Sequence, residues 1–379
     1  MSSENGMDSS VVLKQGVKSK KILLIALLII VIVIAIIFIM IALVKTVGKN
    51  SLYGNASSSG MVFELENAED GMWEEGMVVY NGKLYRYNEE ILTFLILGID
   101  HQGEVEEAED GISGGQSDAI FLAVCNPVEG QIDVIAVNRN TMTEIERYNE
   151  EGEFLWTETA QIAIQHGYGD GLEQSCERSV SAVSNLFYQL PIHGYASINM
   201  GGITAINDAV GGVEVTMNED VSFNTYSFDY SYDADGNVIH SEVNPYLYEK
   251  GETVLLEGDV AYWYLRDRDA TQFDSASDRL NRQKQYIVAF INKMIEVLKS
   301  DVTIVGDIYE IANEYVVTDV SLDEMAYMAT TVALYDFNIE NMHSLEGETI
   351  TGEEYEEFYV DTQAMYELIL DVFYLEVEE

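Results

Sequence analysis

The sequence predicts a layered α/β domain preceded by one transmembrane helix. Three features support this prediction: one long apolar run near the N-terminus, several short apolar runs after it, and segments with helical periodicity between those short runs. The chain has 379 residues, of which 47% are hydrophobic and 11% aromatic. That composition supports a sizeable buried core and argues against a disordered chain.

The long apolar run, Ile22–Val44, has 23 residues and contains no charged residue, glycine or proline. As a helix it reaches about 35 Å, which is enough to cross the ~30 Å hydrocarbon core of a bilayer. The apolar region of a cleaved signal peptide has only about 7–15 residues and ends at a small-residue cleavage site, which is lacking here. We therefore predict that Ile22–Val44 spans the lipid bilayer.

The flanking charges predict the orientation of this helix. Four lysines lie in residues 1–21 and two follow the helix, an asymmetry that favours a cytoplasmic N-terminus. We expect a single-pass protein of the cell membrane with a cytoplasmic head (residues 1–21), a linker rich in Ser, Gly, Asn and acidic residues (45–76) and an extracellular domain (77–379).

The net charge of −47 excludes a nucleic-acid-binding protein, because a protein that neutralises phosphates needs surplus Lys and Arg. Residues 1–50 carry a net charge of +4, so the acidity belongs to the remainder of the chain. Two cysteines cannot form a disulfide framework. Cys125 and Cys176 are expected to be small core residues, with a bond in an external compartment as the alternative.

Strands and helices are expected to alternate along the domain. Asn81-Gly82 is a type I′ hairpin signal. Three short apolar runs suit strands that are covered on both faces: Ile91–Ile99, Ala119–Val124 and Ile132–Val137. Helices are predicted over Thr159–His166, Leu172–Leu190, Asn199–Asp208 and Ser277–Leu298.

Arginines are scarce in the domain, yet four of its eight lie within 17 residues. Arg266 and Arg268 would project from the same face of a strand. Arg279, Arg282 and Gln283 would line one side of a helix near its N-terminus, where free N–H groups favour an anion. Such guanidinium groups can hold several phosphate oxygens. The alternative is a set of weak surface ion pairs with the neighbouring aspartates.

Polar residues also gather at the ends of the predicted strands. Asp100 follows the first run, Asp118 directly precedes the second, and Arg139 follows the third. In open α/β sheets, ligand-binding residues collect at strand ends and in the adjoining loops. Carboxylate oxygens are preferred ligands of Mg²⁺, which takes its remaining ligands from water and phosphate. Taken singly, each aspartate is more often a turn or cap residue than a metal ligand.

Seven blocks in order along the chain resemble the LytR-CpsA-Psr family of cell-envelope phosphotransferases. They span nearly all of the chain after the membrane helix, and the family's short cytoplasmic head and single anchor match as well. The blocks are LILGID (Leu95–Asp100), QSDAIFL (Gln116–Leu122), IAVNRNTM (Ile135–Met142), HGYGDG (His166–Gly171), NDAVGGVEV (Asn207–Val215), LEGDVAYWYLRDR (Leu256–Arg268) and DRLNRQKQY (Asp278–Tyr286).

This resemblance implies a mixed sheet between helices and a polyprenyl pyrophosphate whose lipid tail lies in an apolar tunnel. It also implies transfer of a glycan phosphate to a hydroxyl of peptidoglycan, with release of polyprenyl phosphate, and it allows a pyrophosphatase side activity. Matched block by block, Asp100 and Asp118 would hold Mg²⁺ and form the catalytic group together with Arg139. The residues expected to bind the pyrophosphate are Arg139, Arg266, Arg268, Arg279 and Gln283, to which charge and spacing add Arg282.

The chain departs from the family pattern at three positions. Gln116 stands where the family usually has arginine, Asn140 where it has aspartate, and Gln161 where it has lysine. An amide can neither accept a proton as a general base nor supply negative charge near a metal. The competing interpretation is therefore a non-catalytic or weakly hydrolytic module that binds the lipid pyrophosphate and regulates envelope assembly. A DNA-binding regulator is disfavoured by charge and topology.

The chain contains two weaker motifs as well. Ser231, Asp233, Asp235 and Glu242 have the spacing of an EF-hand loop, but the first ligand position is Ser and no helices flank it, which favours a hairpin tip. His101, next to Asp100, is favoured as a loop residue over one that approaches the metal.

Overall fold

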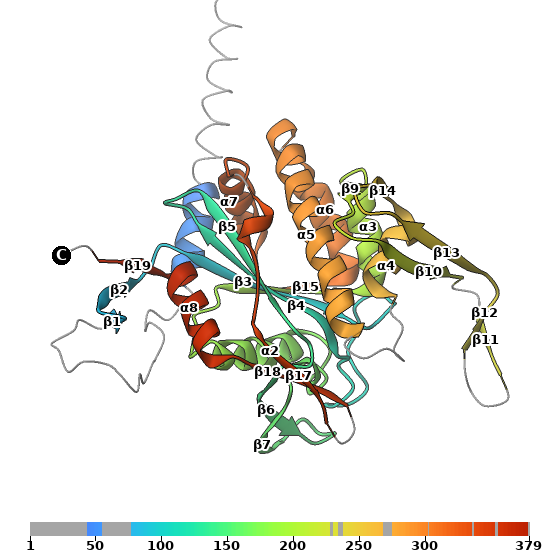
Figure 1. Ribbon diagram of the computed structural model, residues 1–379, viewed down its shortest axis with the longest axis horizontal. Coiled ribbons are helices and arrows are strands. Elements are labelled where there is room, and N and C mark those ends of the chain that lie inside the picture. The colour runs from blue at the N-terminus through green and yellow to red at the C-terminus, as the bar shows by residue number, and fades with distance from the viewer. Residues whose placement is uncertain are drawn as a thin grey trace, which may run out of the picture.

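The fold is built around a mixed six-stranded sheet (Figure 1). The computed structural model describes residues 44–54, 77–227, 230–233, 238–267, 275–301, 303–335, 337–352 and 355–377. In spatial order the strands of this sheet are β15 (Val316–Thr318), β8 (Gly194–Asn199), β3 (Leu92–Ile99), β4 (Ser117–Asn126), β5 (Gln131–Val137) and β16 (Met342–Ser344). Strands β3, β4 and β5 are antiparallel, whereas β8 runs parallel to β3 and β16 parallel to β5. The three predicted central strands are confirmed.

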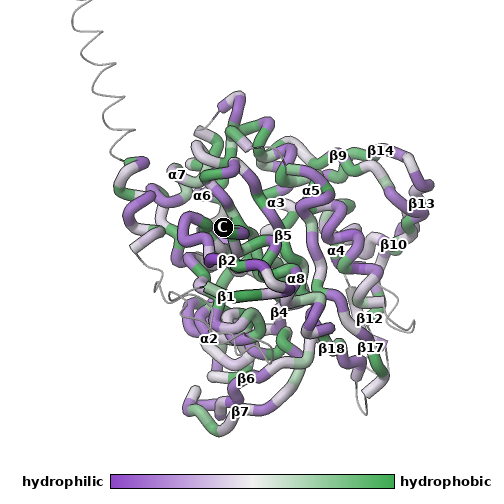
Figure 2. The backbone as a smooth tube through the Cα atoms, turned by 60° about the vertical axis from the view of Figure 1, so that its left-hand side comes forward, coloured by the Kyte–Doolittle hydropathy of each residue, from purple (hydrophilic) through white to green (hydrophobic). Residues whose placement is uncertain are grey.

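The central strands are buried on both faces because their side chains alternate between two apolar layers. On β4, Leu122 belongs to one core cluster and Phe121 to the other. On β5, Ile135 and Val134 divide in the same way. Figure 2 shows hydrophobic segments concentrated around β5 at the centre of the molecule. This double burial explains why the strands appear in the sequence as continuous apolar runs.

Helices cover both faces of the sheet, as the sequence predicts (Figure 1). Helices α2 and α8 pack on one face, and α5 and α7 pack on the other. The helices are α2 (Glu173–Leu186), α3 (Met200–Ala209), α4 (Gly258–Arg266), α5 (Ser275–Ser300), α6 (Ile304–Tyr315), α7 (Leu322–Val332) and α8 (Thr362–Phe373).

Among the described residues, six smaller sheets surround this core. Their strands are β1 (Met77–Tyr80), β2 (Lys83–Tyr87) and β19 (Tyr374–Glu376); β6 (Met142–Tyr148) and β7 (Phe154–Gln161); β9 (Val213–Thr216) and β14 (Thr253–Leu256); β10 (Val221–Tyr226) and β13 (Val243–Tyr248); β11 (Tyr230–Tyr232) and β12 (Val238–His240); β17 (Gly347–Thr351) and β18 (Glu356–Val360). A separate apolar cluster joins α3, α4 and α5 to the strands β9, β10 and β14. It holds the C-terminal end of α4 beside α5.

Two sequence-based assignments are wrong. Residues 159–161, expected to begin a helix, end strand β7 and pair with β6, and only Ile162–Ile164 form a single 3₁₀ turn. The segment expected to carry Arg266 on a strand is helix α4, which ends at that residue. Its aromatic run has strand propensity, but all five residues from Ala261 to Leu265 are buried, and periodicity cannot tell a fully buried helix from a fully buried strand.

Part of the predicted linker is also structured. Residues 44–54 form a helix. Its Leu52 is 1% exposed and belongs to the core cluster on the face of the sheet that α5 and α7 cover. The backbone of Gly48 lies so close to Asp323 at the start of α7 that an added Cβ would clash with its carbonyl oxygen. The linker prediction failed here because one buried leucine among polar residues leaves almost no periodicity. Residues 55–76 lie outside the described residues.

The predicted membrane span, Ile22–Val44, lies outside the described residues except for its last residue. Among the helices that are described, none combines the length and the hydrophobicity needed to cross a bilayer.

The local turn and cysteine predictions are confirmed. Asn81 and Gly82 both have positive φ angles, 51° and 76°, as a type I′ turn between β1 and β2 requires. In the EF-hand-like segment, Ser231 of β11 pairs with Ile239 of β12 in antiparallel register, as a hairpin requires, whereas Asp235 lies outside the described residues. Cys125 and Cys176 are free and buried, in core clusters on opposite faces of the sheet.

A buried histidine makes the stability of this fold sensitive to acid. Burial lowers the pKa of His193 to about 4, and its Nδ1 accepts a hydrogen bond from the backbone N–H of Thr93 at 3.1 Å. In the unfolded chain its pKa is about 6.5, so between these values the unfolded state binds the extra proton and stability falls as pH falls. Between pH 7 and pH 5 this group should remove about 2 kcal/mol of unfolding free energy.

Urea denaturation of wild type and His193→Gln at both pH values measures this effect. The variant should lose less stability than wild type on acidification, and the exposed His101→Gln should behave as wild type. Equal losses in wild type and His193→Gln would contradict the assignment.

Candidate functional site

Three polar segments meet at one edge of the central sheet. Asp100 directly follows β3, Asp118 is the second residue of β4, and Arg139 lies in the turn after β5. Because β4 is antiparallel to both neighbours, the end of β3, the start of β4 and the end of β5 lie at the same edge. The backbone N–H of Asp100 donates to the carbonyl of Gln116 at 3.1 Å, which joins the first two segments directly.

Asp118 lies between two arginines. Its Oδ1 is 2.6 Å from a terminal nitrogen of Arg139, and its Oδ2 is 2.9 Å from one of Arg279. The three side chains are only 8%, 14% and 4% exposed, respectively. Water therefore screens these ion pairs weakly, and together with the hydrogen bond from Arg279 to Asp118 they fix the orientation of both guanidinium groups. The sequence-predicted residues Asp118, Arg139 and Arg279 thus form one cluster.

Arg266 pairs with the other carboxylate of the site. Its terminal nitrogen is 3.0 Å from Oδ1 of Asp100, and both side chains are partly exposed. The guanidinium carbon lies 5.7 Å and 5.5 Å from the ring centroids of Tyr262 and Trp263, which precede it by one turn of α4. Gln102 donates to the Tyr262 hydroxyl at 3.0 Å. These aromatic and amide contacts hold Arg266 at the rim of the site.

Arg282 and Gln283 point toward the end of α4. Arg282 Nε donates to the carbonyl of Tyr264 at 2.9 Å, and its Nη2 donates to the carbonyl of Asp267. Gln283 donates to the carbonyl of Leu265 at 3.2 Å. The side chain of Arg282 is buried, and this burial lowers its pKa. Both side chains satisfy carbonyls that the end of a helix leaves free, and so they position Arg266.

The amide side chains at the three positions that depart from the family pattern all form hydrogen bonds. Gln116 contacts Arg139, and Gln161 contacts Asn140. The Oε1 of Gln116 accepts a hydrogen bond from Arg139. Gln161 Nε2 donates to Asn140 Oδ1 at 3.0 Å and to the carbonyl of Glu356 at 2.8 Å. Asn140 is 7% exposed, and its backbone N–H donates to Asn138 Oδ1 at 2.9 Å. A neutral amide pair therefore occupies the positions where the family pattern has lysine and aspartate.

The donor set is compatible with Mg²⁺. Asp100 follows the end of β3 and Asp118 lies at the start of the neighbouring β4, and Mg²⁺ is commonly held by one or two carboxylates together with water and substrate phosphate. The described residues contain no group of three or more His, Cys, Asp or Glu that could hold a metal by themselves. Two carboxylates therefore suit a metal that arrives with a phosphate better than a fully protein-bound metal centre.

The remaining site predictions differ in outcome. Arg268 lies outside the described residues. His101 is on an exposed loop, with Nε2 3.8 Å from Glu106. Gln102, Tyr262 and Trp263, which support Arg266, are not among the site residues predicted from the sequence. Tyr262 and Trp263 lie four and three residues before Arg266, a spacing that brings side chains together on a helix. The segment was expected to be a strand, so this spacing gave no signal.

Comparison with known proteins places this site in a family. The family model described as LytR_cpsA_psr matches residues 55–370. The chain belongs to the LytR_cpsA_psr family. Polyisoprenyl-teichoic acid–peptidoglycan teichoic acid transferase TagU of Halalkalibacterium halodurans is 30% identical over 263 residues, which cover 69% of each chain. TagU of Oceanobacillus iheyensis is 28% identical over 276 residues, covering 71% of this chain and 72% of the relative.

Solved structures show that this family member has the LytR_cpsA_psr fold. Bacillus subtilis TagV superimposes with a TM-score of 0.51 at 19% identity, covering 75% of this chain and 96% of that chain. TagT bound to LIIa-WTA superimposes with a TM-score of 0.50 at 19% identity, covering 75% and 89%. These similarities confirm the mixed α/β architecture predicted from the sequence.

The contacts of Arg282 predict a role in stability. Replacing it by glutamine removes charged donors from two carbonyls and should lower the free energy of unfolding by about 2–3 kcal/mol. Arg266→Gln breaks a partly exposed ion pair and should cost less than about 1 kcal/mol. Urea denaturation compares the two variants. An Arg282→Gln protein as stable as wild type would show that the carbonyl contacts do not stabilise the end of α4.

Proposed function

We propose that this protein transfers a glycan phosphate from a polyprenyl-pyrophosphate-linked precursor to peptidoglycan. The observation that carries the proposal is the convergence of Arg139, Arg266 and Arg279 on two aspartates at one sheet edge. Three arginines against two carboxylates leave one positive charge in a chain whose net charge is −47. The names of the relatives, which act on polyisoprenyl-linked teichoic acid and peptidoglycan, support the same reaction class.

The arginines suit the charge changes of the reaction. An acceptor hydroxyl forms a bond to the phosphorus next to the glycan, and the bond between the two phosphates breaks, so that polyprenyl phosphate leaves with additional negative charge. Arg139 and Arg279 are already oriented by Asp118, so they can bind phosphate oxygens with little loss of side-chain freedom. Arg266, which is more exposed, is placed to bind the incoming diphosphate first.

Mg²⁺ is part of the proposal. Asp100 and Asp118 would hold it, and when bound it would supply positive charge beside the phosphate oxygens. The carboxylates that would hold the metal are the ones that pair with the arginines in the structure, so the metal and the three arginines would lie around the same phosphate oxygens.

The lipid tail is proposed to lie along the apolar layer between α5 and the sheet. Arg279 lies in the first turns of α5, and farther along this helix the partly buried Ile287 and Ile291 pack against the same core cluster as Phe121 of β4. The pyrophosphate-binding end and the apolar layer are therefore consecutive along one helix. With Ile22–Val44 in the membrane and the domain outside the cell, the site would face lipid-linked precursors.

The neutral pair of Asn140 and Gln161 favours a second candidate, a module that binds the lipid pyrophosphate without efficient turnover. The acceptor hydroxyl must lose a proton, and an amide cannot take it up. Asn140 also contributes no negative charge near the proposed metal. The same binding geometry would then serve regulation of envelope assembly.

Turnover by the full chain in detergent separates the two candidates. The protein is incubated with a polyprenyl-pyrophosphate-linked glycan, Mg²⁺ and peptidoglycan, and released polyprenyl phosphate is measured. We expect release by wild type and a loss of at least about 100-fold in Arg139→Ala, because a preorganised charge is removed from the transition state. Arg86→Ala, which changes an exposed arginine of β2, is the matched control. Equal release by wild type and Arg139→Ala would overturn the proposal.

The variant Asn140→Asp tests the second candidate in the same assay. If wild type binds but does not release polyprenyl phosphate and Asn140→Asp does, the chain is a binding module with an inactivated base position. If both proteins release it at the same rate, residue 140 does not carry the general base.

A further inference from the structure

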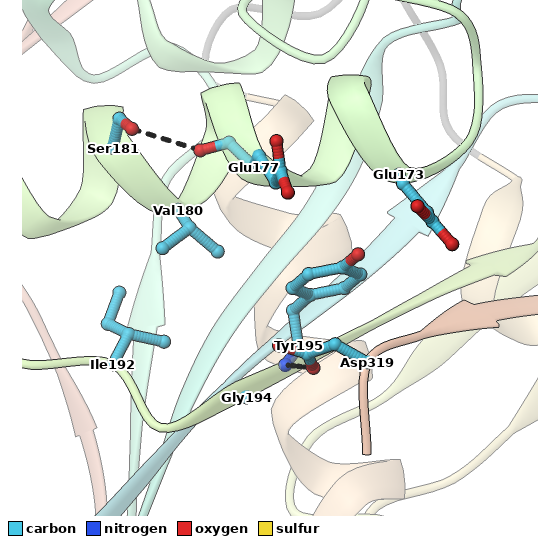
Figure 3. A pocket seen from close by; sticks show the side chains of 8 residues that line it. All are labelled: Glu173, Glu177, Val180, Ser181, Ile192, Gly194, Tyr195 and Asp319. Carbon is cyan, nitrogen blue, oxygen red and sulfur yellow. Dashed lines mark hydrogen bonds between the residues drawn. The ribbon is translucent and has the colours of Figure 1, made fainter. Parts of the chain in front are cut away.

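A cavity lies on the face of the sheet that is covered by α2, away from the arginine cluster. It has a volume of about 440 Å³ and is formed between α2, the start of β8 and the residue after β15. Figure 3 shows Glu173 and Glu177 reaching from α2 over Tyr195, with Asp319 beside it. The remaining lining residues are Val180, Ser181, Ile192 and Gly194.

The charge of this cavity is entirely negative. Three of its lining side chains are carboxylates and none is a lysine, arginine or histidine. Glu173 and Glu177 are one helical turn apart on the same face of α2, where like charges repel. Within the part of the chain that the structure describes, neither carboxylate forms an ion pair. Their repulsion is thus uncompensated by any described residue.

A buried tyrosine hydroxyl is directed into the same cavity. The side chain of Tyr195 is 5% exposed, and Figure 3 shows its hydroxyl directed toward α2 between Glu173 and Glu177. Among the described residues this hydroxyl has no hydrogen-bond partner, although the backbone N–H of Tyr195 donates to Asp319 Oδ1 at 2.7 Å. Its oxygen, like the carboxylate oxygens of Glu173 and Glu177, can accept hydrogen bonds from a ligand in the cavity.

The arrangement of the carboxylates and the size of the cavity bear on whether a metal ion or an organic cation would bind there. The described residues contain no group of three or more carboxylates, histidines or cysteines close enough to hold a metal ion, so these three do not form a chelating set. The cavity volume lies in the range of small-molecule sites, far larger than one ion. Val180, Ile192 and the ring of Tyr195 add an apolar wall. Negative charge around an apolar wall suits an organic cation.

We propose that this cavity binds an aliphatic primary ammonium group, of the type at the end of a lysine side chain. The ammonium would donate hydrogen bonds to Glu173, Glu177 and the Tyr195 hydroxyl, and the carbon chain would lie on Val180 and Ile192. The source of the ammonium is either a peptide or a free diamine.

This site is separate from the proposed transfer centre. Tyr195 pairs with Leu95 of β3, five residues before Asp100, which corresponds to about 16 Å along the strand. The cavity also lies under α2, whereas Arg279 belongs to α5 on the opposite face. Binding here is independent of the proposed reaction, and its failure would leave that proposal untouched.

Binding of small probes to the full chain in detergent tests the proposal. The probes are Nα-acetyl-lysine methylamide, 1,5-diaminopentane and the uncharged Nα-acetyl-norleucine methylamide, each titrated by calorimetry or ligand-observed NMR. We expect the ammonium probes to bind and the norleucine probe not to bind. Affinity for the lysine amide alone identifies a peptide as the source, and affinity for the diamine alone identifies a free diamine.

Variants locate the binding site. Glu177→Gln and Glu173→Gln should each weaken binding about tenfold, and Tyr195→Phe should weaken it severalfold without changing the circular dichroism spectrum. Glu348→Gln, which changes an exposed glutamate of β17, is the matched control and should bind as wild type. Equal binding of the norleucine and lysine probes, calcium binding at this site without ammonium binding, or unchanged affinity in Glu177→Gln would each overturn the proposal.

Discussion

The candidate transfer site depends on one buried interaction, the carboxylate of Asp118 held between Arg139 and Arg279. This contact ties the start of β4 to the turn after β5 and to the first turns of α5. Buried ions are costly unless they are paired, so the carboxylate keeps both guanidinium groups in place in the absence of substrate. The same geometry is available to a phosphate, whose oxygens can replace those of Asp118 as acceptors.

The neighbouring amides show how this site differs from the usual family pattern. Gln161 contacts Asn140, so the expected lysine and aspartate are replaced together by a neutral pair that keeps a hydrogen bond between the two positions. Gln116 accepts a hydrogen bond from Arg139, which an arginine at that position could not do. The changes preserve the positions of the binding arginines and alter the charge around the acceptor hydroxyl. They affect proton transfer more directly than substrate binding.

Much of this architecture was predictable from the sequence. The three strand runs are short, largely buried and continuous in the sequence, and Asp100, Asp118 and Arg139 were found because they adjoin those runs. The roles of Arg282 and Gln283 were not predictable, because spacing shows which helix face they share but not that this face meets the carbonyl end of α4. The same limit applies to Tyr195, since only the folded chain brings it beneath two glutamates of α2.

The most direct test of the account is the affinity of the full chain for geranylgeranyl pyrophosphate in the presence of Mg²⁺. Arg139→Gln and Arg279→Gln should each weaken binding at least about tenfold, because each removes a charge-assisted contact to the diphosphate. Arg86→Gln should bind as wild type. Wild-type affinity in both site variants would show that the cluster around Asp118 is only a structural ion pair and would contradict the account.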